Sequence, residues 1–366
     1  MKQDSRIPSL DGLRAIAVLF VVFSHLLGTR GFLQPPTTNF LYELGYLGVK
    51  VFFVISGYLI TNLLLQELQR NNRIHLGKFY FRRTFRIFPA CYVMIAGLIV
   101  LHGAGWIDLT PRDVFHALSY TSNYFSHRSW SLGHTWSLGV EEQFYLLWPA
   151  TLVLLGRRKG FWVAASVILM CPAIRVVLWN VYHVGGVGHR FETVADAIAT
   201  GCLLAGAHDW LGSQARYTKF LESKVFLAVP ATVLAVGMLH THPTVYNLIS
   251  HTIMNLGIAL CIDFCVRHHT GSMGRLLNSR PMVFIGVMSY SIYLWQQLFF
   301  NRYSVSVFTQ FPVNLLLAAG ASMVSYYVVE RPCLSLRQNL EKKIFARSPD
   351  AAPMARVAAA SKAMAA

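Results

Sequence analysis

The chain has 366 residues, of which 54% are hydrophobic and only 13% are charged. A soluble domain has about 25% charged residues, so a soluble enzyme, a secreted disulfide domain and a disordered protein all match this composition poorly. An integral membrane protein is the class that it favours. The formal net charge of +16 would also suit nucleic-acid binding, unless the positions of the charges explain it otherwise.

Apolar runs close to membrane-spanning length recur along the chain, and we count about ten of them. They cover residues 10–27, 41–65, 87–102, 136–155, 161–181, 193–207, 225–239, 248–266, 282–300 and 312–329. The pattern predicts an all-α integral membrane protein without a second folded domain. We expect one membrane-embedded unit over residues 1–346, followed by a disordered, Ala-rich cytoplasmic tail over residues 347–366.

The basic residues lie mainly on one side of this predicted topology. If the N-terminus is cytoplasmic, the cytoplasmic connections and ends contain 24 of the 32 Lys and Arg residues, and the opposite connections contain four. Since Lys and Arg are enriched on the cytoplasmic side, we expect both termini to be cytoplasmic. The excess positive charge is then explained by orientation and lipid headgroups, and no nucleic-acid partner is expected.

The first run contains three ionisable residues. Arg14 and His25 are eleven residues apart, which places them on one helix face about 16 Å apart along the axis. Charged side chains inside a membrane are costly, so both are functional candidates. The alternatives are that Arg14 reaches out to the interface and that His25 pairs with a neighbouring helix. Asp11 is either a functional residue as well, or a carboxylate in the first turn that interacts favourably with the helix dipole.

Two further candidate segments follow along the chain. "FFVISGYLIT" places Ser56 beside a glycine, with Lys50 six residues earlier, and small residues of this kind also allow helices to pack closely. "FYFRRTFRIFPA" contains Arg82, Arg83 and Arg86 at the predicted cytoplasmic entrance of the third run. Guanidinium groups match phosphate oxygens, although the same residues would also serve as a cytoplasmic anchor.

The segment "HTWSLGVEEQFYLLWP" opens the fourth run with two adjacent carboxylates. Glu141 and Glu142 are preceded by His134, Trp136 and Ser137. Neighbouring carboxylates repel each other, so one would be protonated or paired with a cation. The alternative is an ordinary interfacial anchor with solvated glutamates.

Asp196 lies within the sixth run and needs a partner there. Arg175 and His25 are both available, and the sequence does not choose between them. No histidine spacing of the H-E-x-x-H kind occurs, so we expect no metal site.

The ordered set of segments resembles the acyltransferase-3 family of bacterial membrane acyltransferases. The matching segments are "LDGLRAIAVLFVVFSH" at 10–25, "GVKVFFVISGYLIT" at 48–61, "FYFRRTFRIFPA" at 79–90, "TWSLGVEEQFYLLWP" at 135–149, "IGVMSYSIYLW" at 285–295 and "VVERP" at 328–332. Each segment is modest alone, but together and in this order they are specific.

The resemblance implies a ten-helix enzyme of the bacterial cytoplasmic (inner) membrane. Members move acetyl or other short acyl groups from cytoplasmic acyl-CoA, with no permanently bound cofactor, to extracytoplasmic carbohydrates such as surface polysaccharides, peptidoglycan or nodulation oligosaccharides. Some acylate macrolides. Polysaccharide-assembly proteins are the partners that this chemistry suggests. By match, His25 corresponds to the essential histidine of the family and Arg14 to its partner arginine.

One position departs from the family pattern. Gln296 stands where the family commonly has a histidine, in "YSIYLWQQ". Glutamine donates and accepts hydrogen bonds but does not titrate, which removes an acid–base role at this position.

The residues and the resemblance lead to one hypothesis. Arg14, the cluster Arg82, Arg83 and Arg86, and Trp136 hold acyl-CoA, while His25 removes the proton of the acceptor hydroxyl. Glu142 or Asp196 orients the imidazole, and Asp11, Lys50, Ser56, Ser137, Glu141 and Gln296 are further candidates. A covalent acyl-imidazole is an alternative. The rival classes are a transporter or flippase of a glycan or lipid, a catalytically inactive scaffold, and an enzyme that acylates a small molecule.

Overall fold

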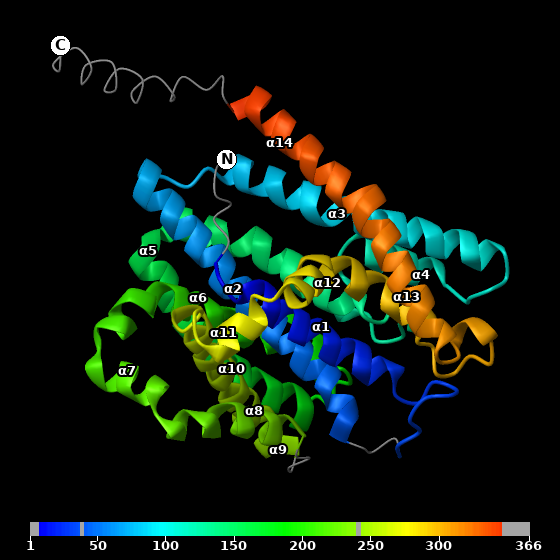
Figure 1. The fold of residues 1–366 in the computed structure, drawn as a ribbon, viewed down its shortest axis with the longest axis horizontal. Helices are drawn as coiled ribbons and strands as arrows, with labels where there is room; N and C mark the ends of the chain where they lie inside the picture. The colour runs from blue at the N-terminus through cyan, green and yellow to red at the C-terminus, as the bar shows by residue number, and fades with distance from the viewer. Residues whose placement is uncertain (1–6, 37–39, 239–242, 346–366) are drawn as a thin grey trace.

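The computed structural model describes residues 7–36, 40–238 and 243–345, and these ranges are helical without any strand (Figure 1). The α-helices are Leu10–Leu26 (α1), Glu43–Asn71 (α2), Leu76–Gly103 (α3), Pro111–Leu118 (α4), Thr135–Asn180 (α5), Phe191–Ser213 (α6), Ala215–Glu222 (α7), Ala228–Met238 (α8), Pro243–Val245 (α9), His251–Arg267 (α10), Ser272–Leu277 (α11), Arg280–Phe299 (α12), Val313–Val324 (α13) and Arg331–Phe345 (α14). Shorter 3₁₀ and π-helical turns link several of them.

Each predicted apolar run overlaps a helix. In the described part of the chain, six helices are long and apolar enough to cross a membrane, and a bent pair, Ala215–Glu222 with Lys224–Gly237, would make a seventh. An all-α, multi-pass membrane protein is therefore confirmed. The number ten and the cytoplasmic termini stay predictions, and the predicted tail at 347–366 lies outside the described residues.

The fourth and fifth runs form two helical halves of α5, as expected, but a single non-helical residue, Gly156, separates them in place of the expected loop. α5 is 46 residues long and changes direction at Gly156, where φ is 74° and ψ is 168°. Glycine adopts positive φ without steric cost. The basic residues that follow Gly156, predicted as a connection at 157–160, are therefore part of the helix.

The helices pack closely where glycines face neighbouring backbones. A Cβ at Gly57 on α2 would lie 2.0 Å from the carbonyl oxygen of Ile198 on α6, and a Cβ at Gly201 on α6 would lie 2.1 Å from the carbonyl oxygen of Val54. Two backbones can approach this closely only where both side chains are absent. The close-packing interpretation of the Ser56–Gly57 step is confirmed.

α1 runs through the middle of the bundle and packs against α2 and α12 (Figure 1). Its first turns contain Asp11 and Arg14, while His25 lies in its last turn. Any site at Arg14 is consequently about 16 Å from a site at His25 along the helix axis.

Candidate active site

Most of the predicted residues gather around one cavity of about 520 Å³, which we call the arginine cavity. Helices α1, α2, α3, α5, α12 and α14 all contribute to its lining. Nine sequence-predicted residues line it: Asp11, Arg14, Ser56, Arg82, Arg83, Arg86, Ser137, Glu141 and Glu142. Among these nine, residues as far apart in the sequence as Asp11 and Glu142, 131 positions, are thus brought to one cavity.

Acidic side chains accompany the arginines in this cavity. Arg82 donates from Nε to Glu341 Oε1 at 3.0 Å, and Lys78 lies 3.5 Å from the same oxygen. By contrast, Arg14 and Arg86 form no ion pair within 4 Å with any carboxylate in the described ranges. Arg83, which also lines the cavity, likewise forms no ion pair within the described residues, so three guanidinium groups are available for an anionic ligand.

The two predicted glutamates have different surroundings. Glu141 Oε1 accepts a hydrogen bond from Ser56 Oγ at 2.7 Å, and Tyr145 donates to the same serine at 3.4 Å. Glu142 has a buried carboxylate oxygen that finds no hydrogen-bond partner within the described part of the chain. Arg83 lies over the Tyr145 ring, 5.3 Å from its centroid.

His25 lines a second cavity of about 330 Å³, which we call the His25 cavity. Two tryptophans, Trp130 and Trp136, line it with the polar side chains of Arg128 and His134. The centroids of the His25 and Trp130 rings are 6.1 Å apart. Flat aromatic surfaces beside a few convergent polar groups are typical of a site for an uncharged polar ligand.

The hydrogen bond of His25 defines the state of its ring. His25 Nδ1 lies 2.9 Å from Gln296 Oε1, and Gln296 is fully buried. Because an amide oxygen only accepts, Nδ1 is the donor in this contact, and in the neutral imidazole the lone pair is then on Nε2. An imidazole in this state is ready to accept a proton at Nε2.

The predicted orienting role of Glu142 or Asp196 is wrong. Glu142 lines the arginine cavity, where His25 is not among the lining residues, and Asp196 is paired with Arg175. Gln296 takes that role, so the residue that departs from the family pattern is the one that holds the imidazole.

The two cavities share part of their lining, Val49 and Tyr293. The Tyr293 hydroxyl lies 2.5 Å from Ser137 Oγ and donates to the backbone carbonyl of His134 at 3.0 Å. Ser137 therefore helps to hold the wall between the cavities. Val49 and Tyr293 therefore face both cavities.

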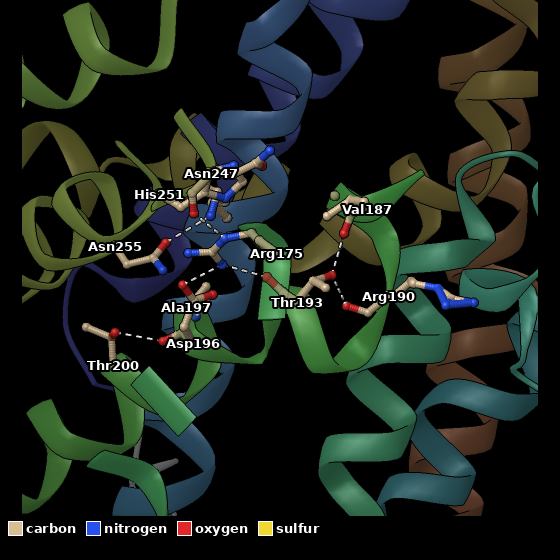
Figure 2. A network of polar contacts seen from close by, with 12 residues as sticks. Arg175, Val187, Arg190, Thr193, Asp196, Ala197, Thr200, Asn247, His251 and Asn255 are labelled. Carbon is tan, nitrogen blue, oxygen red and sulfur yellow. Dashed lines mark hydrogen bonds and ion pairs between the residues drawn. The ribbon is translucent and has the colours of Figure 1, made fainter. Parts of the chain in front are cut away.

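Lys50 and Asp196 line neither cavity. Asp196 belongs to a buried polar network around Arg175 (Figure 2). Arg175 Nη1 lies 2.8 Å from Asp196 Oδ2, and both side chains are at most 1% exposed. Lys50 Nζ donates to Asn255 Oδ1 at 3.1 Å. Of the two partners that the sequence offered for Asp196, the structure selects Arg175.

Sequence reasoning missed part of the His25 cavity. Trp136, predicted to help hold the donor, lies in the His25 cavity and not with the arginines. His134 lines the same cavity and directly precedes the segment "TWSLGVEEQFYLLWP" at 135–149. His189 comes from a short connection without periodicity; burial, and then Arg128 at 3.4 Å, lowers its pKa to about 4. It is therefore neutral at physiological pH.

Residues 7–331 match the acyltransferase-3 family model, described as an acyltransferase domain. The chain is 30% identical over 317 residues to peptidoglycan O-acetyltransferase OatA of Listeria monocytogenes, covering 79% of this chain and 48% of the relative. It is 30% identical over 361 residues to O-acetyltransferase OatA of Staphylococcus aureus, covering 89% and 57%. The chain thus spans about half the length of these relatives. No solved structure matches it significantly.

Proposed function

The chain belongs to the acyltransferase-3 family, and from this premise we propose that it transfers an acetyl or other short acyl group from acyl-CoA to a carbohydrate hydroxyl. The acceptor is extracytoplasmic and the donor cytoplasmic, in a bacterial cytoplasmic membrane. The names of the relatives favour a cell-wall carbohydrate as acceptor. The observation that carries the proposal is the His25–Gln296 hydrogen bond, because it leaves a basic nitrogen beside a tryptophan-lined cavity.

Support for the donor comes from the arginine cavity. Arg14 and Arg86 are without carboxylate partners within 4 Å among the described residues, so their donors are available to the phosphates of coenzyme A. Arg82 is 44% exposed at its side chain, which opens this end of the cavity to solvent. The thioester would then extend toward Tyr293 and Val49, at the wall shared with the His25 cavity.

The chemistry follows from these positions. Nε2 of His25 takes the proton of the acceptor hydroxyl while the hydroxyl oxygen attacks the thioester carbonyl carbon. A C–O ester bond forms, the C–S bond breaks, and the proton is delivered to the departing thiolate. Positioned proton transfer of this kind contributes about 10²–10⁴-fold to a rate.

Purified protein in lipid vesicles provides the test. With [¹⁴C]acetyl-CoA and a soluble disaccharide fragment of peptidoglycan, we expect label in the disaccharide, in an amount proportional to the protein. A transporter or flippase, which also uses buried ionisable residues, would move the glycan without labelling it. Absence of labelled product from every hydroxylated acceptor offered would refute the proposal.

The arginine cavity makes its own prediction. Arg14→Gln and Arg86→Gln are each expected to weaken acetyl-CoA binding by about tenfold, since a charge-assisted hydrogen bond contributes about 1.5–3 kcal/mol. Titration of detergent-solubilised protein with acetyl-CoA measures the effect. Arg216→Gln, at an exposed position on α7, is the matched control. Unchanged affinity in both cavity variants would remove the phosphate assignment.

A further inference from the structure

His134 is a buried imidazole that the chemistry at His25 leaves unused. It occupies the N-cap position of α5 without a side-chain capping hydrogen bond, is 3% exposed and lines the His25 cavity. The backbone of Leu294 lies near enough to act weakly on the ring, but neither nitrogen has a hydrogen-bond partner of normal geometry in the described part of the chain. Buried polar groups nearly always have partners, so this one requires an explanation.

The ring is held in place although neither nitrogen has a hydrogen bond of normal geometry in the described part of the chain. It packs edge-on against the Tyr293 ring, with centroids 5.4 Å apart. The backbone carbonyl of His134 accepts hydrogen bonds from the hydroxyls of Tyr293, at 3.0 Å, and Ser137, at 3.2 Å. A polar side chain that is fixed by its neighbours and still unsatisfied is suited to binding a ligand.

Two further unsatisfied atoms line the same cavity, Ser129 Oγ and Gln297 Oε1. The Gln297 amide nitrogen donates to the Trp130 carbonyl at 2.6 Å, which fixes the amide and leaves its oxygen to accept. The imidazole and the serine hydroxyl each offer both a donor and an acceptor. A mixed set of this kind matches several sugar hydroxyls, each of which also donates and accepts, better than it matches an anion.

We propose that His134 is a specificity-determining residue of the acceptor site, where it binds a hydroxyl adjacent to the one that His25 deprotonates. The inference rests on the proposed function and narrows its acceptor to compounds with neighbouring hydroxyls. His134 holds the acceptor and takes no proton from the attacking oxygen. Its loss therefore affects recognition of the acceptor and leaves the donor side unchanged.

The test is a steady-state comparison with the same labelled donor and peptidoglycan disaccharide. His134→Phe keeps an aromatic ring and removes both nitrogens. We expect the KM for the disaccharide to rise about tenfold or more, with kcat within about threefold of wild type and the KM for acetyl-CoA unchanged. His134→Gln, which can still donate and accept, should recover part of the loss. His116→Phe is the control, because His116 lies on α4, in the stretch between α3 and α5 that also contains His134, and lines neither cavity.

Each outcome decides the matter. An unchanged disaccharide KM in His134→Phe would overturn the inference, and so would a parallel loss for disaccharide and acetyl-CoA, which indicates a structural role. If the phenylalanine variant fails to fold, His134→Ala is measured in the same way against the same criteria. A wild-type protein that labels no acceptor would refute the proposed function itself, whereas wild-type transfer with an indifferent His134 would refute only this inference.

Discussion

His25→Ala is expected to lower acetyl transfer by about 10²–10⁴-fold, the contribution of a positioned general base. The alanine variant removes the imidazole whose Nδ1 donates to Gln296 Oε1 across 2.9 Å and whose Nε2 is left to take the proton. Binding of acetyl-CoA should change little, because His25 does not line the arginine cavity. The measurement is the transfer rate in vesicles beside acetyl-CoA affinity in detergent.

His102→Ala is the matched control for this loss. His102 lies in the last turn of α3, lines neither cavity, and its Nδ1 lies 2.9 Å from the carbonyl oxygen of Ile107. Near-normal turnover in His25→Ala, with a folded protein, would eliminate the imidazole as the base. A loss of equal size in His102→Ala would show that the effect is not specific to the cavity.

His25→Ala also separates direct transfer from a route through a covalent acyl-imidazole. In the direct route, wild-type protein incubated with [¹⁴C]acetyl-CoA and no acceptor retains no label after denaturation. The covalent route would leave label on the wild-type chain that His25→Ala lacks. We expect the direct route, because the neutral Gln296 amide holds the ring without adding a negative charge that would stabilise an acylated, cationic imidazole.

The helices could be predicted because their apolar composition is a local property of the sequence. The first run predicts 10–27, and α1 spans Leu10–Leu26. α5 differs in one detail, because only Gly156 has non-helical torsion angles between its two helical halves, whereas the three basic residues after it suggested a longer connection. Charge marks a boundary of the membrane, but it does not mark the end of a helix.

The candidate site was predictable where spacing along one helix decided the geometry. Arg14 and His25, eleven residues apart, are at opposite ends of α1, and each lines a different cavity. The partner of His25 was not predictable, because Gln296 is 271 positions away and its contact depends on how α12 packs against α1. Trp136 lies in the His25 cavity and not beside the arginines for a related reason. Neighbours in a helical motif project to different faces, so Trp136 and Glu142 line different cavities.

The roles of Lys50 and Asp196 could not be predicted from the sequence, since a buried charge has a structural as well as a functional explanation. Arg175 donates to the backbone carbonyls of Thr193 and Asn247 at 2.6 and 2.8 Å as well as to Asp196 (Figure 2). The guanidinium group of Arg175 on α5 is thereby bonded to α6 and to the π-helical turn Tyr246–Ser250. The sequence alone assigns such residues to a membrane-embedded polar site, but only the contacts identify them as part of the scaffold.

Asp196→Asn is therefore expected to destabilise the fold by about 3–5 kcal/mol, since breaking a buried pair leaves an uncompensated charge. Arg175 would keep its position without a counter-ion, and Lys50 would add a second cation to the same buried network. Thermal unfolding of the detergent-solubilised protein measures the effect. Asp209→Asn makes the same substitution at an exposed position on the same helix, and we expect it to leave the midpoint almost unchanged.

The double variant Arg175→Met, Asp196→Leu distinguishes charge from packing. If the loss in Asp196→Asn comes from an unpaired charge, removing both partners should restore much of the stability, because well-packed apolar residues can replace a buried ion pair at little cost. If the loss instead comes from the hydrogen bonds of Arg175 to Thr193 and Asn247, the double variant should be less stable than Asp196→Asn, because it loses those bonds as well. A midpoint for Asp196→Asn equal to that of Asp209→Asn would contradict both explanations.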